Sequence, residues 1–106
     1  MTRYLLGIDN GGTVTKAGLF DLAGREMATA GRKTPMSSPG PGYTERDMDV
    51  LWQATAEAVR EVIDRAAVDP ATIACVATAG HGNGLYLVDA QLRPVRPGIV
   101  STDTRA

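Results

Sequence analysis

The feature that most constrains the fold is a glycine-rich turn between two short apolar runs near the amino terminus. The first run covers Tyr4 to Asp9 and stops at Asn10-Gly11-Gly12, and a loosely alternating run follows from Thr15 to Asp21. Short apolar runs bounded by turn residues are typical of strands joined by a tight connection. A second turn at Leu22 to Arg25 then predicts a third strand from Glu26 to Thr34, which completes an antiparallel meander.

The next segment predicts one long helix. After a loop rich in Pro, Gly and Ser at Met36 to Tyr43, Asp47 is a suitable N-cap, and apolar residues then recur at helical spacing. We therefore expect a helix from about Met48 to Ala67, which spans residues 47–67 with its cap. Trp52, in the first turns of this helix, is expected to pack in the interior rather than to bind a ligand.

A continuous apolar run near the middle of the chain predicts a fourth strand. Ile73 to Thr78 has no charged interruption, as expected for a strand buried on both faces, so we expect a central parallel strand. Cys75 would then be a buried thiol in a reducing compartment, since a single cysteine has no partner for an internal disulfide. A glycine-rich loop at 79–84 and a hairpin from Leu85 onward follow this strand.

Size and charge limit the classes of partner. The 106 residues correspond to one small domain or to part of a larger one, and a formal net charge of −1 provides no basic field for nucleic acid or an anionic membrane. No segment reaches the ~18 apolar residues of a membrane span, and the amino terminus does not resemble a signal peptide, so we expect a cytoplasmic protein. One helix covers one face of a sheet, so we expect a second copy or the remainder of a longer chain to cover the other.

The turn after Asp9 carries groups suited to phosphate chemistry. In such a turn we expect backbone N–H groups at Gly11 and Gly12 and the hydroxyl of Thr13 to point to one spot, with Lys16 adding a positive charge. Asp9 would bring a Mg²⁺ ion to bound phosphates rather than bind them itself. The same residues would also make an ordinary hairpin turn capped by Asp9, so spacing alone leaves both readings open.

The segment from Gly7 to Asp21 resembles the first phosphate segment of the actin, hsp70 and sugar kinase superfamily. There an Asp-x-Gly-Gly-Thr hairpin lies between two strands of a ribonuclease-H-like sheet. The resemblance implies an α/β, ribonuclease-H-like domain of which this chain holds the amino-terminal part. It implies Asp9 as the Mg²⁺ residue, and it implies these ligands for the phosphates of ATP: Gly11, Gly12, Thr13, Thr15 and Lys16.

Three further segments resemble the FGGY carbohydrate kinases. They are Gly42 to Asp47 followed by Leu51-Trp52, the stretch from Thr78 to Asp89, and Ser101 to Arg105. The resemblance covers residues 1–106. It implies that residues 1–34 form the phosphate-hairpin strands, that residues 47–67 form the helix, and that residues 73–106 form the central strand, the sugar loop and a hairpin. Within the family, the segments most resemble those of the bacterial kinases of L-xylulose, 3-keto-gulonate or erythritol type. The residues implied for sugar binding are His81, Gly82, Asn83, Asp103 and Arg105.

The resemblance implies part of an ATP-dependent kinase that phosphorylates a ketose or polyol. Asn83 and Gly84 stand where many xylulose kinases have His-Gly, and Ser101 stands where the family usually has Trp, so the resemblance argues against D-xylulose as the sugar. The family's catalytic base lies beyond these residues, so the chain alone is expected to be inactive. His81 is more typical of a hydrogen-bonding loop residue than of a base. The alternatives are a superfamily ATPase activator or hydantoinase-like protein, and a non-catalytic module that binds sugar or phosphate.

Overall fold

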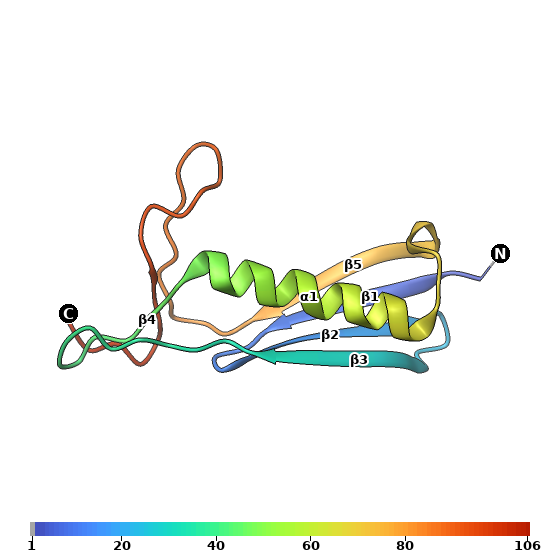
Figure 1. Cartoon of the computed structure of the whole chain (residues 1–106), viewed down its shortest axis with the longest axis horizontal. Helices are drawn as coiled ribbons and strands as arrows, with labels where there is room; N and C mark the ends of the chain where they lie inside the picture. The colour runs from blue at the N-terminus through green and yellow to red at the C-terminus, as the bar shows by residue number, and fades with distance from the viewer. Residues whose placement is uncertain (1) are drawn as a thin grey trace.

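A computed structural model describes residues 2–106 as a four-stranded sheet with one long helix lying along it (Figure 1). The predicted meander and helix are confirmed to within one or two residues. The elements are β1 Tyr4–Asn10, β2 Val14–Asp21, β3 Glu26–Lys33, β4 Glu45–Arg46, α1 Met48–Ala66, the 3₁₀ helix η1 Pro70–Thr72, β5 Ile73–Gly80 and β6 Gly98–Ile99.

The sheet has the strand order β3-β2-β1-β5, with β1 antiparallel to β2 and parallel to β5. The parallel pairing of Ile73–Gly80 is as predicted, but its central and buried position is wrong. Among residues 2–106 this strand lies at the sheet edge, and all of it after Ile73 is exposed. Cys75 is therefore exposed rather than buried. An apolar run predicts a strand whose side chains are buried by other elements, but it does not show which elements bury them.

The helix is positioned by its caps and by small side chains. The Asp47 carboxylate accepts hydrogen bonds from the backbone N–H groups of Asp49 and Val50 at 2.8 and 3.0 Å, which fixes the start of α1. Its last turn closes at Ala67, whose φ is 54°. The core between helix and sheet contains Leu6, Ala17, Leu19, Ala30, Ala58 and Val62. Several of these are alanines, which lets the helix approach the sheet closely.

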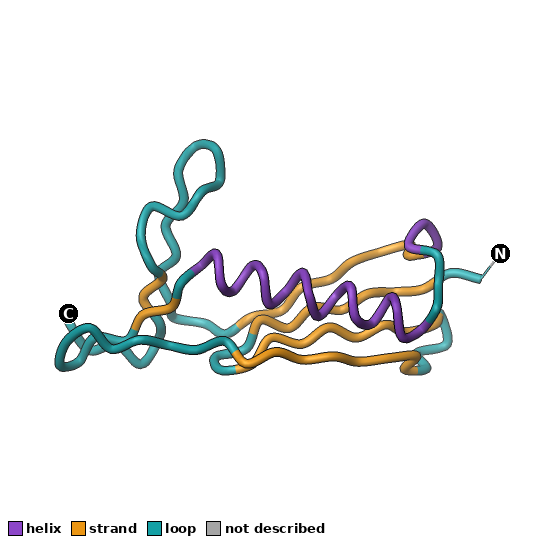
Figure 2. The backbone as a smooth tube through the Cα atoms, viewed as in Figure 1, coloured by secondary structure: helices purple, strands orange, loops and turns teal. Residues whose placement is uncertain are grey.

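Helix α1 packs mainly on β2 and β3, so the helix side of β1 and β5 is less covered. Figure 2 shows the helix running along the strands on one side of the sheet. A groove between α1 and the β5 edge is lined by side chains that include Trp52, Val59 and Val76. Trp52 is 66% exposed at this groove, so the expected packing of its ring is wrong for the described residues. We call the sheet face opposite α1 the open face.

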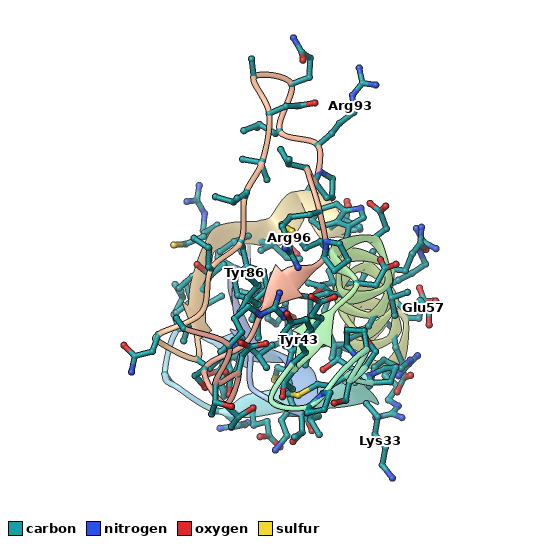
Figure 3. All side chains as sticks on the ribbon, turned by 90° about the vertical axis from the view of Figure 1, so that its left-hand side faces the viewer. Lys33, Tyr43, Glu57, Tyr86, Arg93 and Arg96 are labelled. Atoms are coloured by element: carbon teal, nitrogen blue, oxygen red, sulfur yellow. The ribbon has the colours of Figure 1, made fainter. Side chains whose placement is uncertain are left out.

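The remaining residues form an extension at one end of the sheet. Strands β4 and β6 pair antiparallel, and a hairpin with bridges between Leu85 and Ile99 and between Val88 and Pro94 projects from them. Figure 3 shows Arg93 on this projection and Tyr86, Arg96 and Tyr43 near its base. The molecule is elongated, with extents of 52 × 27 × 20 Å. Neither helix of residues 2–106 is long and apolar enough to cross a membrane.

Candidate functional site

The site begins at the glycine turn, which we define as residues 10–14 between β1 and β2. The Gly11 N–H donates to the carbonyl of Val14 at 3.0 Å. A Cβ on Gly11 would lie 2.8 Å from that carbonyl oxygen, so the turn needs glycine there. A Cβ on Gly12 would meet nothing within 4 Å. Within residues 2–106, the N–H groups of Gly12 and Thr13 donate no hydrogen bond, so two adjacent donors remain free at an accessible turn.

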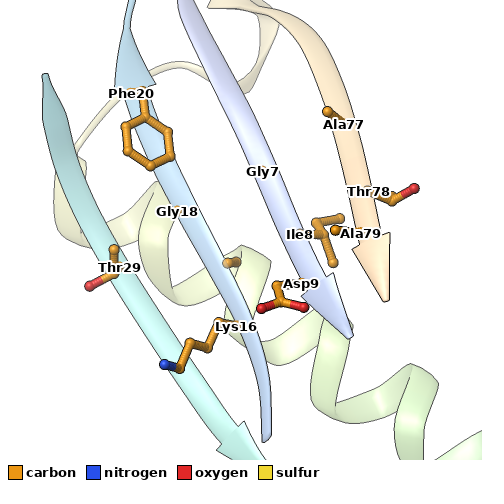
Figure 4. Close-up of a pocket in the computed structure, with 11 residues that line it drawn as sticks. Gly7, Ile8, Asp9, Lys16, Gly18, Phe20, Thr29, Ala77, Thr78 and Ala79 are labelled. Carbon is orange, nitrogen blue, oxygen red and sulfur yellow. The ribbon is translucent and has the colours of Figure 1, made fainter. Parts of the chain in front are cut away.

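Asp9 and Lys16 lie beside the glycine turn on the open face. They are paired across the β1–β2 ladder, and both are exposed. Figure 4 shows their side chains on the same face of the sheet, with the helix behind the strands. They line a shallow pocket with Phe20 and Thr29. The arrangement places one carboxylate and one ammonium group next to the free N–H groups of the turn.

Thr15 lies on the other face, apart from the other predicted phosphate ligands. It is 0% exposed. Its hydroxyl donates to the carbonyl of Asp9 at 3.3 Å and accepts from Asn10 Nδ2 at 2.5 Å. Asn10 Nδ2 also donates to the hydroxyl of Thr55 on α1 at 2.9 Å. The alternation of side chains along β2 explains this separation, because neighbours such as Thr15 and Lys16 point to opposite faces.

The predicted sugar loop is attached to the glycine turn through His81. Its backbone N–H donates to the carbonyl of Asn10 at 3.1 Å, and its Nδ1 lies 3.2 Å from the same oxygen. Because a carbonyl only accepts, Nδ1 carries the proton, and the Tyr86 hydroxyl, 2.8 Å from Nε2, donates to the other ring nitrogen. Both nitrogens of His81 are therefore engaged within the protein.

Two glycines make room for the Tyr86 ring. A Cβ on Gly84 would lie 2.7 Å from this ring, and a Cβ on Gly98 would lie 2.2 Å from it. The ring meets His81 edge to face, with centroids 5.7 Å apart. Gly82 and Asn83 remain exposed, and Asn83 has a φ of 64°. The exposed Asn83 is thus the side chain of this loop that is free to meet a ligand.

The predicted residues Asp103 and Arg105 lie in a charged cluster with Glu45 and Arg96. Arg105 Nη2 lies 2.7 Å from Glu45 Oε2 and 2.6 Å from Asp103 Oδ2. Arg96 Nη2 lies 2.6 Å from the same Glu45 oxygen. The guanidinium of Arg105 also lies 4.1 Å from the centroid of the Tyr43 ring. The structure brings these residues together, and the Arg105 side chain is bonded through both Nε and Nη2 to carboxylates of the protein.

The charges of this cluster perturb its carboxyl groups. Hydrogen bonds from Arg105 lower the pKa of Asp103 well below its usual range, and hydrogen bonds and charge from Arg105, with further charge from Arg96, lower the pKa of Glu45. Sequence reasoning did not assign Glu45 or Arg96 to the site. The signal for Glu45 was present, because it is the acid of the Gly-aromatic-x-Glu segment at residues 42–45.

The residues of this site would offer a magnesium ion one carboxylate, that of Asp9, rather than a full set of protein ligands. No group of three or more His, Cys, Asp or Glu residues that could hold a metal occurs within residues 2–106. Mg²⁺ commonly takes only one or two carboxylates and completes its shell with waters and substrate phosphates. The exposed carboxylate of Asp9, beside two free N–H groups, would fit an ion that is held in this way.

Comparison with known proteins gives a family for this arrangement. Residues 4–106 match the model of the amino-terminal domain of the FGGY family of carbohydrate kinases. A probable L-xylulose kinase from Pasteurella multocida is 42% identical over 104 residues, which are 98% of this chain and 22% of that protein. An L-xylulose/3-keto-L-gulonate kinase from Escherichia coli is 39% identical over 106 residues, 100% of this chain and 21% of that protein. The chain thus spans about a fifth of the length of these relatives.

A solved structure supports the same relationship. The crystal structure of xylulose kinase from Rhodospirillum rubrum matches with a TM-score of 0.84 and 30% identity, over 97% of this chain and 21% of that one. The expected α/β fold class, the sugar kinase fold, is confirmed by this match.

Proposed function

Because the chain belongs to the FGGY family of carbohydrate kinases, we propose that it acts as the amino-terminal part of an ATP-dependent kinase for a ketose or polyol. The observation that carries the proposal is the glycine turn, whose free N–H groups at Gly12 and Thr13 lie beside the exposed Asp9 and Lys16. Phosphoryl transfer relies mainly on positioning and on stabilisation of negative charge, and these groups supply both. The kinase would act in the cytoplasm, with the sugar and ATP as its partners.

In this proposal the glycine turn binds phosphate oxygens of ATP. The free N–H groups of Gly12 and Thr13 donate to the phosphates, and Lys16 contributes positive charge. Gly11, predicted as a phosphate ligand, instead shapes the turn, because its N–H is already bonded to the carbonyl of Val14. Asp9 would hold Mg²⁺, which neutralises charge on the phosphates when it is bound. Thr15 lies on the sheet face opposite Asp9 and Lys16, and its buried hydroxyl holds the carbonyl of Asp9 in place. It is therefore proposed to position Asp9 rather than to touch the nucleotide.

The sugar would be bound at the extension beside the glycine turn. Asn83 contacts sugar hydroxyls directly, and Gly82 leaves room for them because it has no side chain. His81 sets the position of this loop through Asn10 and Tyr86. Asp103 and Arg105 shape the neighbouring wall, since their polar atoms are already paired with each other and with Glu45. The names of the relatives favour L-xylulose or 3-keto-L-gulonate as the sugar.

The experiment that tests this function is an assay of ADP release by the full-length protein that carries these residues. L-Xylulose, 3-keto-L-gulonate, D-xylulose, erythritol and glycerol are each supplied with MgATP. We expect release that depends on one or a few of these sugars and that falls by orders of magnitude in Asp9→Asn. ADP release that no sugar stimulates would contradict the proposal and would favour a superfamily ATPase. The 106-residue chain alone is expected to release no ADP, since the catalytic base is proposed to lie elsewhere in the kinase.

A further inference from the structure

The second residue of β4, Arg46, is a buried cation without an acidic partner. It is 1% exposed, and its Nη2 donates to the carbonyl of Gly12 in the glycine turn. Its Nε and Nη1 are buried and donate to nothing in residues 2–106, and it forms no ion pair there. A buried guanidinium with unpaired donors is costly for the fold, so stability does not explain an arginine at this position.

The bond to Gly12 has a direct geometric effect on the turn. The carbonyl of Gly12 and the N–H of Thr13 belong to one peptide unit, which is planar and trans, so they point in opposite directions. A carbonyl held by Arg46 therefore directs the Thr13 N–H away from Arg46. The following carbonyl, that of Thr13, accepts from the backbone N–H of Thr34 at 2.9 Å. The two successive carbonyls of this turn are thus held from outside, and the free N–H group lies between them.

We propose that Arg46 is a positioning residue for phosphoryl transfer. It holds the Gly12–Thr13 peptide so that the Thr13 N–H faces the bound phosphate, and its buried charge is balanced only when a phosphate group occupies the turn. This inference rests on the proposed kinase function. It adds to that function a side chain that would touch neither substrate and that would still set the geometry and the electrostatic potential of the phosphate site.

The position of Arg46 in the chain fits this role. Side chains that follow one another along a strand point to opposite sides, so the two residues of β4 serve two different places. The Glu45 carboxylate joins the charged cluster through Arg96 and Arg105, while the Arg46 guanidinium reaches the glycine turn. One short strand therefore attaches the proposed sugar wall to the proposed phosphate site.

The test uses the full-length kinase with Arg46→Met, Arg46→Lys and the control Arg65→Met. Arg65 also donates to a backbone carbonyl, that of Thr29 at 2.6 Å. Its side chain is exposed, however, and it lies in the last turn of α1 rather than at the glycine turn. Steady-state constants for MgATP and for the sugar are measured, together with melting temperatures with and without MgADP. Loss of one preorganised donor typically costs about 10²–10³-fold in kcat.

For Arg46→Met we expect a fall in kcat of about 10²-fold with an unchanged sugar KM, and a smaller rise in melting temperature on addition of MgADP. Without nucleotide, its melting temperature should equal or exceed that of the wild type, because an unpaired buried charge has been removed. Arg46→Lys should recover most of the kcat, and Arg65→Met should match the wild type in kcat and in the MgADP response.

The proposal is overturned if Arg46→Met keeps the wild-type kcat and MgADP response, whatever its melting temperature, since Arg46 would then be a structural residue alone. If Arg46→Met does not fold, Arg46→Lys is compared with the neutral Arg46→Gln. A kcat preserved by Lys and lost in folded Gln supports the role of the charge, and equal values for the two overturn it. A wild type without sugar-dependent ADP release would instead contradict the kinase function.

Discussion

Glu45 and Arg105 form an ion pair of 2.7 Å between segments that lie 60 residues apart in the chain. The pair holds the last residues of the chain against the segment that leads into α1. Asp103 strengthens it by accepting from Arg105 Nε at 2.8 Å and from the backbone N–H of Thr44 at 2.6 Å. Charged hydrogen bonds therefore add to the backbone pairing of β4 with β6 in this extension, and their contribution depends on pH.

The first prediction concerns that pH dependence. Arg105 holds the pKa of Asp103 below its unfolded value, so the ionised carboxylate stabilises the fold above the ordinary carboxyl range. This contribution is lost as the pH falls through the lower, folded pKa. We expect Asp103→Asn to reduce the free energy of unfolding at pH 7 and to differ progressively less from the wild type on acidification. Urea unfolding at several pH values measures this, and a difference that is constant down to strongly acid pH would contradict it.

The second prediction separates the two proposed ligand sites in the full-length kinase. Asp9→Asn should lower kcat by orders of magnitude with little change in the sugar KM, because only the MgATP side loses a group. Asn83→Ala should chiefly raise the sugar KM. Asp64→Asn, an exposed acid on α1, serves as the charge control and should match the wild type. Equal changes of one kinetic constant in both site variants would contradict the division of roles.

Local signals account for the parts of the fold that the sequence predicted well. The glycine turn, the cap at Asp47 and the strand bounds depend on neighbouring residues, so they can be read from the chain directly. The separation of Thr15 from Lys16 was also readable, since alternation along a strand places them on opposite faces. The position of Cys75 at an exposed edge depends instead on which elements cover the strand, and no local pattern records that.

The predicted site residues differ in how accessible the fold leaves them. Asp9, Lys16 and Asn83 are exposed beside the glycine turn or on the sugar loop, where a ligand can reach them. His81 has both ring nitrogens engaged, which depends on Tyr86 meeting it across the loop. No sequence pattern indicates a role for Arg46, because arginine is seldom buried and only the tertiary fold places it against Gly12.

The third prediction concerns the hydroxyl of Tyr86. Tyr86→Phe keeps the ring between its two glycines and removes the donor to His81 Nε2. We expect a loss of about 1 kcal/mol in the free energy of unfolding and a raised sugar KM, because the loop carrying Asn83 loses its anchor. Tyr4→Phe, at the far end of β1, is the control and should leave the sugar KM unchanged. A sugar KM unaffected by Tyr86→Phe would show that His81 is held by Asn10 alone.

The fourth prediction concerns burial of the exposed edge strand β5 by a second copy or by the rest of a kinase. Cys75 is exposed in this chain, so a thiol reagent should modify it quickly in a dilute sample of the 106 residues. The uncovered apolar side chains near it, such as Leu5 and Val76, favour association with a second copy or with the rest of a kinase. Modification should therefore slow as the concentration rises a hundredfold, and it should be slow in the full-length kinase. Rapid modification of Cys75 under every condition would contradict burial of this edge strand.

The last prediction compares two adjacent glycines that differ in their surroundings. In Gly11→Ala the new methyl group would lie 2.8 Å from the Val14 carbonyl oxygen, so the backbone of the turn must shift. We expect a loss of about 1–3 kcal/mol in the free energy of unfolding, together with weaker MgATP binding. In Gly12→Ala the methyl group enters open space, and stability should change by no more than about 0.5 kcal/mol.

That same open space is where the phosphate is proposed to lie. Gly12→Ala should therefore raise the KM for MgATP in the full-length kinase while the protein melts like the wild type. Urea unfolding and steady-state kinetics on the two variants separate the effects, since one substitution alters the turn and the other alters only the space in front of it. A Gly12→Ala kinase with the wild-type KM for MgATP would mean that the phosphates approach the turn from the Asp9 side rather than over Gly12.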